Sequence, residues 1–453
     1  MCRIFVIFLL IFSASLTSHQ GAAQGIRLIQ DTEIENTLRI FSTPIFKAAN
    51  LKASSVEIYI VNDDSLNAFV AGGQKLFMNS GLLLQSETAN QIIGVIAHET
   101  GHIAGGHLSR IHSALSKSSV PAILAMILGG AASVATGRGD VGAAIMAGGQ
   151  NVAERNFLAY SRTQEGAADH AALGYLDKTK QSARGLLAFM RKLEDQDLLS
   201  SAQQDPYIRS HPLSSHRVAT VENHVESSPF SDADEPPGFG DLYNRMMAKL
   251  LAFMHPYSIT LRTFPPSDKS LAGMYARAIA EFRNKNLDGA LAIMNELIKV
   301  QPGDPYFHEL KGQMLFENGR ATEAMAAYAI AAELLPNAPY IHRDLARAQM
   351  ETGDVRLLDK AIANMEIALA RGQNTARNWR FLAIAHGRNG DLPRSYLALG
   401  EEALILGKPG TARFQAERAK KEFSRGSREW LQAEDILLAA ENVERILKRQ
   451  RER

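Results

Sequence analysis

The sequence has almost no cysteine. Of its 453 residues only Cys2 is a cysteine, and Met1 alone precedes it, so the apolar lead-in of a lipoprotein attachment site is missing. A single cysteine cannot form a disulfide within the chain. The composition therefore excludes a small extracellular scaffold that is held together by disulfides.

An excess of charge of either sign is also missing. Lys and Arg total 49 and Asp and Glu total 48, which leaves a formal net charge of +1. A protein that binds nucleic acid needs a basic surface to meet the phosphates. The charge balance gives no argument for such a partner, and we expect none.

No convincing membrane span is present, because the apolar runs fall short of the roughly twenty residues that a spanning helix needs. The run over residues 4–12 follows Arg3 and precedes the small residues Gly21-Ala22-Ala23, a pattern typical of a secretory signal peptide. We expect residues 1–23 to be removed after Ala23, and an uncleaved anchor is the alternative. Export without disulfides favours the bacterial periplasm.

A second apolar region covers residues 120–134 and 141–147 and is interrupted by several glycines. Neither run is long enough to span a membrane. We expect a glycine-broken helical hairpin packed on its domain. The alternative is a mobile flap that makes a peripheral contact with a membrane or a partner.

The length predicts two or more domains, since 453 residues exceed one compact core. Residues 56–61, 67–70 and 75–78 have the pattern of short strands, and 91–104 and 151–178 have apolar residues at helical spacing. Residues 227–241 are rich in Pro, Gly, Ser and Asp, which marks a boundary or an exposed loop. We expect an α+β domain over residues 24–260, mostly helical with a small sheet.

From about residue 268 the pattern changes to a repeat. Ala290 and Ala324 are 34 residues apart, and so are Pro302 and Pro336. A 34-residue period with small residues at helix crossings and proline after the second helix resembles tetratricopeptide repeats. We therefore expect an all-α repeat domain over residues 268–453, which offers a curved surface to a protein or peptide.

The most informative segment is His98-Glu99-Thr100-Gly101-His102. Histidines at i and i+4 lie on one face of a helix, so both imidazoles can reach a single zinc ion. Glu99 is then placed to hold and deprotonate a water molecule. In a buried helix these polar groups would be costly unless a metal compensates them. The alternative is a core helix whose histidines merely find hydrogen-bond partners.

A catalytic zinc site normally uses three protein ligands, so a third is needed. Glu165 is the candidate, because it lies on a predicted helix with Asp169 four residues later on the same face. Asp169 suits an acceptor that orients a ligating imidazole. His107 falls on a different face from His102 and is expected to be structural.

His211 lies in a loop before Pro212, from which its ring could reach back to the open position of the metal. Arg217 is close enough in sequence to line the same cleft. Either side chain is also a candidate for stabilising the oxyanion.

Five segments together resemble the gluzincin metallopeptidases of the HtpX and CAAX-prenyl-protease family. They are Asn67-Ala68-Phe69, Gly81-Leu82-Leu83, the motif over 98–102, residues 165–169 and Ser210-His211-Pro212. With a signal peptide and C-terminal repeats, the chain is similar to the periplasmic BepA-type proteases, which assist outer-membrane protein assembly. The resemblance implies zinc bound by His98, His102 and Glu165, Glu99 as the catalytic base, and Asp169 as support. It also implies that His211 occupies the fourth zinc position and restrains activity.

We predict a periplasmic zinc endopeptidase with one Zn²⁺ per chain. It would cleave unfolded or misassembled proteins and meet the outer-membrane assembly machinery through its repeats. The alternative is a chaperone or adaptor with a self-blocked zinc site, although a pure scaffold has no need of Glu99 as a base. The strand at Leu76-Phe77-Met78 is expected to bind substrate backbone as an added strand.

Overall fold

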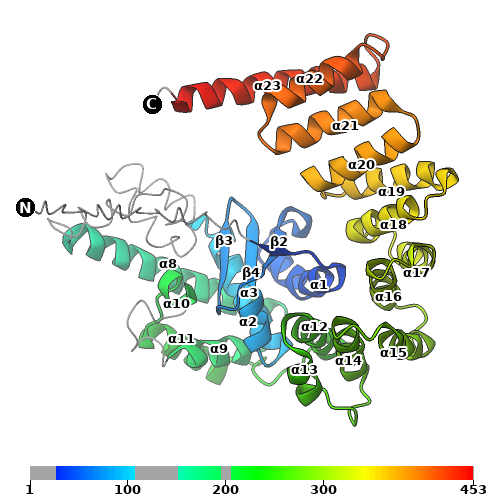
Figure 1. The fold of residues 1–453 in the computed structure, drawn as a ribbon. Coiled ribbons are helices and arrows are strands. Elements are labelled where there is room, and N and C mark those ends of the chain that lie inside the picture. The colour runs from blue at the N-terminus through cyan, green and yellow to red at the C-terminus, as the bar shows by residue number, and fades with distance from the viewer. Residues whose placement is uncertain (1–26, 108–150, 195–205, 452–453) are drawn as a thin grey trace, which may run out of the picture.

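The computed structural model describes residues 27–107, 151–194 and 206–451 (Figure 1). The expected signal peptide and the glycine-rich region over 120–147 lie outside these ranges. A mostly helical domain with a small sheet precedes an all-helical repeat array, which confirms the predicted fold class. Among the described helices, none combines the length and apolarity needed to span a bilayer.

The sheet has four strands in the order β1-β2-β4-β3. The strands are β1 (Leu28–Ile29), β2 (Glu57–Val61), β3 (Ala68–Ala71) and β4 (Lys75–Asn79). β2 and β4 run parallel, and the two outer pairs are antiparallel. Alternate residues such as Ile58 and Leu76 are buried, whereas Tyr59 and Phe77 stack on the opposite face. The three predicted strands are therefore confirmed.

The expectation that Leu76–Met78 binds substrate as an added strand is wrong. β4 is hydrogen-bonded to β2 on one side and to β3 on the other, so it has no free edge. The outer strands among those described are β1 and β3. Of these two, β3 packs against α3 (Ala89–Ala104) and lies next to α10 (Pro206–Ser210).

α3 is the central helix of the N-terminal domain. Every residue from Gln91 to His102 is buried. Ile92 and Ile96 pack in one core with Leu38 and Phe41 of α1. Besides α10, the other α-helices that the structure describes in this domain are α1 (Thr32–Ala48), α2 (Ser80–Gln85), α8 (Asn151–Lys178), α9 (Arg184–Glu194) and α11 (Ser215–Ser227).

The repeat array consists of helix pairs whose first three pairs begin at Leu271, Pro305 and Pro339, 34 residues apart. In Figure 1 the array runs as a curved arm from α14 near the bottom of the view to α23 at the top. The pairs are α14 (Leu271–Arg283) with α15 (Leu287–Val300), α16 (Pro305–Glu317) with α17 (Ala321–Leu334), α18 (Pro339–Glu351) with α19 (Leu358–Ala370), α20 (Ala376–Arg388) with α21 (Leu392–Ile405), and α22 (Pro409–Lys420) with α23 (Arg428–Arg451).

Two helices lie at the junction between the domain and the array, α12 (Phe239–Met254) and α13 (Tyr257–Thr263). α12 belongs to both cores. Met246 and Leu250 pack in the core of the N-terminal domain, whereas Ala248 and Ala252 pack in the first core of the repeats. One helix therefore joins the two parts by apolar contacts on opposite faces.

The start of α1 lies against the first helices of three successive repeats. The hydroxyl of Tyr275 donates to Glu33 at 2.8 Å, and that of Tyr340 donates to Glu35 at 2.8 Å. The buried ammonium of Lys249 lies 3.3 Å from the carboxylate of Glu33. These polar contacts fix the array to the helix that packs on α3.

Candidate metal centre

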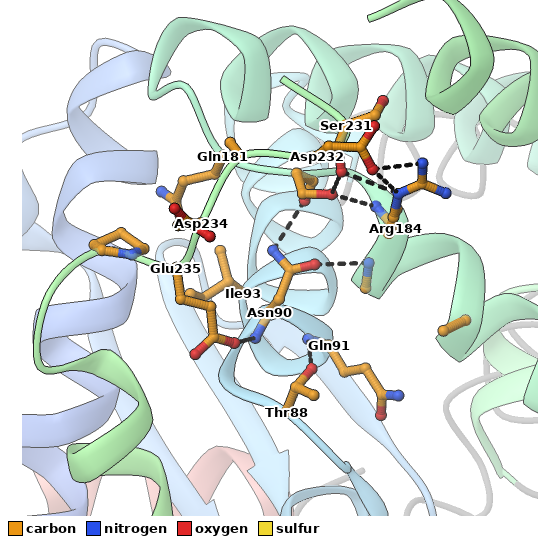
Figure 2. Close-up of a pocket in the computed structure, with 15 residues that line it drawn as sticks. Thr88, Asn90, Gln91, Ile93, Gln181, Arg184, Ser231, Asp232, Asp234 and Glu235 are labelled. Carbon is orange, nitrogen blue, oxygen red and sulfur yellow. Dashed lines mark hydrogen bonds and ion pairs between the residues drawn. The ribbon is translucent and has the colours of Figure 1, made fainter. Parts of the chain in front are cut away.

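Polar side chains fix the N-terminal end of α3 beside a cavity of about 400 Å³ (Figure 2). Thr88 accepts a hydrogen bond from the backbone N–H of Gln91, a cap that satisfies the first turn. Asn90 donates to the carbonyl of Ser182 at 2.9 Å and accepts from the N–H of Gly185 at 2.7 Å. These bonds tie α3 to the start of α9. No histidine lines this cavity, so the cavity is not the candidate metal site. Its polar side chains instead fix the start of α3.

Gly101 brings α8 into backbone contact with α3. A Cβ at Gly101 would lie 2.7 Å from the carbonyl oxygen of Ala168 and 2.9 Å from its Cα, so no side chain fits. Glu165 shares one face of α8 with Ala168, three residues later, and with Asp169, four residues later. The close approach therefore carries both carboxylates to the histidines of the motif.

The predicted ligands meet in one buried cluster. Nε2 of His98 and Nε2 of His102 are 3.1 Å apart. The carboxylate oxygens of Glu165 lie 3.4 Å from each of these nitrogens. Burial lowers the pKa of His102 to about 3, whereas the hydrogen bonds to Asp169 and Glu165 outweigh burial and raise the pKa of His98 to about 10.

His211 joins the cluster from the loop that follows α10. Its Nδ1 lies 3.1 Å from Glu165 and 3.4 Å from Nε2 of His98. Its ring stacks on the ring of Tyr207 with 4.6 Å between centroids. One donor atom from each of His98, His102, Glu165 and His211 lies within 4.8 Å of the others, and all four residues are buried. We refer to these four residues as the donor cluster.

The donor cluster fits a metal ion. Ligands about 2.1 Å from a tetrahedral ion lie roughly 3.4 Å from one another. Apart from the pair His102 and His211, the donor atoms of the cluster are 3.1 to 3.4 Å apart, and all four lie within 4.8 Å of one another. A cation placed between these nitrogens would bind their lone pairs at such distances. The donor set of imidazoles and one carboxylate is the set that zinc prefers.

Glu99 lies beside the donor cluster with both carboxylate oxygens buried and without a hydrogen-bond partner. Its Oε1 is 3.4 Å from Nε2 of His211, which also has no hydrogen-bond partner. Burial raises the pKa of Glu99 because the charged form loses its hydration. A carboxylate in this state readily takes up a proton.

Asp169 and Arg217 support the donor cluster through hydrogen bonds. Asp169 accepts from Nδ1 of His98 at 2.8 Å, and Arg217 donates two bonds to Asp169 at 2.6 and 2.9 Å. Burial alone would raise the pKa of Asp169, but these bonds hold it at about 2. Arg217 also donates to the carbonyl of Pro212 at 2.9 Å. Its guanidinium therefore ties α8 to the loop that carries His211, and its Nη1 also lies 3.2 Å from the carboxylate of Glu165.

Two contacts of the site were not predicted from the sequence. Tyr207 stacks on His211, and its position has no spacing relation to the motif. His107 lies against the far side of the His102 ring, with the two Nδ1 atoms 2.9 Å apart. The second contact could only have been suspected from the presence of a histidine just after the motif helix.

The sequence matches two known families. Residues 31–225 match Peptidase family M48, and residues 275–339 match the tetratricopeptide repeat. The Beta-barrel assembly-enhancing protease of Yersinia pestis is 22% identical over 394 residues, which cover 84% of this chain and 78% of that protein. The protein of the same name from Escherichia coli (strain K12) is 21% identical over 392 residues, 84% of this chain and 77% of that protein. Metalloprotease LoiP from Escherichia coli (strain K12) is 24% identical over 199 residues, 44% of this chain and 73% of that protein.

These matches agree with the geometry, because the M48 match contains α3, α8 and the loop of His211. The family also implies a metal at the donor cluster. The chain thus consists of a metalloendopeptidase domain of family M48 followed by tetratricopeptide repeats, and it is homologous to the beta-barrel assembly-enhancing proteases.

Proposed function

We propose that the protein is a zinc-dependent endopeptidase of the bacterial periplasm that acts in outer-membrane protein assembly and quality control. The observation that carries the proposal is the donor cluster next to the buried carboxylate of Glu99, which has no hydrogen-bond partner. The names of the two beta-barrel assembly-enhancing relatives support the process. The signal-peptide pattern over residues 1–23 supports the location.

In this proposal His98, His102 and Glu165 hold one zinc ion per chain. Zinc bound there would supply a Lewis acid that acidifies water and polarises the scissile carbonyl. Glu99 takes the proton from the attacking water at a carboxylate oxygen and returns it to the leaving amine nitrogen. Asp169 accepts the Nδ1–H of His98 and so keeps its Nε2 directed at the metal.

Substrate backbone would add to β3, which is the outer strand nearest the motif helix and α10. Extended peptides bind sheet edges in this way, and an unfolded protein can supply such a segment. The repeats over residues 268–453 would recruit unfolded or misassembled clients, or the outer-membrane assembly machinery, to the domain over residues 24–260. Repeat arrays offer the extended concave surface that such recruitment needs.

His211 supports a closed resting state. Its Nδ1 lies at the distance expected of a fourth ligand, and four protein ligands leave no position for water. Activity then requires a substrate or partner that binds better to the state with the loop displaced. A closed site also favours a second role as a chaperone or adaptor, and the same molecule can perform both.

The proposal is tested by metal removal. The purified chain should contain one zinc and cleave an unfolded outer-membrane β-barrel protein. A strong chelator should abolish cleavage, and one equivalent of zinc should restore it. Cleavage that survives complete removal of the metal would exclude the proposed chemistry.

A further inference from the structure

The ring nitrogens of His98 and His102 that point away from the donor cluster contact different groups. The outer nitrogen of His98 faces the carboxylate of Asp169. The outer nitrogen of His102 faces a second imidazole, since its Nδ1 lies 2.9 Å from Nδ1 of His107. The two rings meet edge to face, with 4.9 Å between centroids and 81° between planes. His107 is itself 5% exposed, so this contact is shielded from water.

We infer that His107 is a positioning residue for the metal ligand His102. Nε2 of His102 points into the donor cluster, 3.1 Å from Nε2 of His98. A neutral imidazole that binds a metal through Nε2 carries its proton on Nδ1. The Nδ1–H of His102 therefore donates to Nδ1 of His107, which must be the unprotonated nitrogen of that ring. The contact fixes both the tautomer and the ring angle of His102.

The backbone after α3 is shaped to receive this ring. α3 ends at Ala104, and the chain turns back through Gly105 and Gly106, with Gly106 in the left-handed region at a φ of 61°. A Cβ at Gly105 would lie 2.4 Å from Nε2 of His107. The φ of Gly105 is −69°, which any residue can adopt. The obstacle to a side chain at this position is therefore a clash with the ring of His107.

The inference predicts that zinc affinity depends on the acceptor at position 107. His107→Leu replaces the ring with an apolar side chain of similar reach and so removes the acceptor, and we expect zinc affinity to fall roughly ten- to a hundredfold. His107→Asn places an amide oxygen near the position of Nδ1 and should restore most of the affinity. Competition with a chromophoric chelator measures this on the full chain, without reference to activity.

Gly105→Ala provides a test that changes none of the histidines. The added methyl group should displace His107 and weaken zinc binding in the wild-type background. In a His107→Ala background it should have no further effect, because the two changes act through one contact. Additive losses from the two changes would show that Gly105 acts by another route.

The inference rests on the proposed role of His102 as a metal ligand. The zinc affinity of the wild-type chain distinguishes a failure of the inference from a failure of the proposed function. A wild-type chain that binds no zinc contradicts the proposed function itself. A wild-type chain that binds zinc tightly, while His107→Leu binds it equally well, overturns the role of His107 alone. Equal losses in the Leu and Asn variants also overturn it, because a merely structural ring would not distinguish them.

Discussion

Single residues decide whether the donor cluster forms. The motif on α3 supplies two imidazoles, but the third donor arrives only because Gly101 lets α8 approach the backbone of α3. Asp169 then orients His98, and Arg217 neutralises Asp169 while it holds the following loop. His98, His102, Asp169 and Arg217 are each at least nine-tenths buried. A substitution at any one of them should therefore alter metal binding.

Removal of one proposed ligand should therefore remove most of the metal. His98→Ala, His102→Ala and Glu165→Ala each leave two of the three proposed permanent ligands beside the displaceable His211, and zinc affinity should fall by orders of magnitude. Asp169→Asn should keep zinc with an affinity lower by roughly ten- to a hundredfold. Zinc content after purification and chelator competition measure both. Full zinc retention in Glu165→Ala would remove that residue from the ligand set.

The residues that the sequence could identify are those with a fixed spacing. His98 and His102 share a helix face, as do Glu165 and Asp169, so their juxtaposition follows from helical periodicity. The partner of Arg217 could not be predicted in this way. Arg217 lies 48 residues from Asp169, and only the packing of α11 against α8 brings them together.

At the scale of elements, periodicity identified the helices and strands but not their order in space. The alternation of apolar and polar positions in β4 distinguishes its two faces, but it does not indicate which strands flank β4. The parallel pairing of β2 with β4 places β4 inside the sheet. The order of the strands depends on the crossover connection, which leaves no signal in a single strand.

The loop after α10 should behave as a switch. His211→Ala removes the proposed fourth ligand and opens a position for water, while three protein ligands remain. We expect the variant to retain its zinc and to cleave an unfolded protein roughly tenfold faster than wild type. Self-cleavage during purification is a second readout. A zinc-loaded His211→Ala protein that is less active than wild type would instead indicate a role in oxyanion binding.

At the scale of the whole molecule, the repeats are fixed to the peptidase domain by polar contacts that the sequence gives no means to predict. Thr32 donates to Glu309, and the two residues are 277 positions apart. The composition of residues 227–241 predicts a boundary, yet α12 continues past it as part of both cores. A boundary signal of this kind reports local loop composition and not how the flanking parts pack.

This interface should make stability depend on pH. Burial raises the pKa of Glu35 to about 7 and that of Glu309 to about 8, from an ordinary value of 4.5. Between pH 4.5 and 8 the folded chain therefore binds protons that the unfolded chain has released. By linkage, the free energy of unfolding due to these groups falls as the pH rises through this window and is level above it.

Denaturation by urea at pH 5 and pH 8.5 measures this dependence. Glu35→Gln and Glu309→Gln should each flatten it relative to wild type, because glutamine is neutral at both pH values. Glu366→Gln, at an exposed position on α19, is the matched control and should leave the dependence unchanged. Variants at positions 35 and 309 that keep the wild-type slope would contradict the assignment.

Truncation before α14 should separate metal binding from client recruitment. A chain that ends at residue 267 retains every member of the donor cluster and should still bind zinc. It loses the hydroxyl of Tyr275 that bonds to Glu33 and exposes the buried Lys249, so it should unfold at a lower temperature than the full chain. It should cleave a generic unfolded protein but not its physiological clients. Normal client processing by the truncated chain would contradict recruitment by the repeats.

The central claim is that this chain hydrolyses peptide bonds with Glu99 as the base at a zinc site. The most direct test compares His211→Ala with the double variant His211→Ala, Glu99→Gln, because the first change removes the proposed self-block. Both proteins should contain one zinc, and only the single variant should cleave an unfolded β-barrel protein, with at least a hundredfold difference in rate. Equal cleavage by both, or no cleavage by a fully zinc-loaded single variant, would contradict the account.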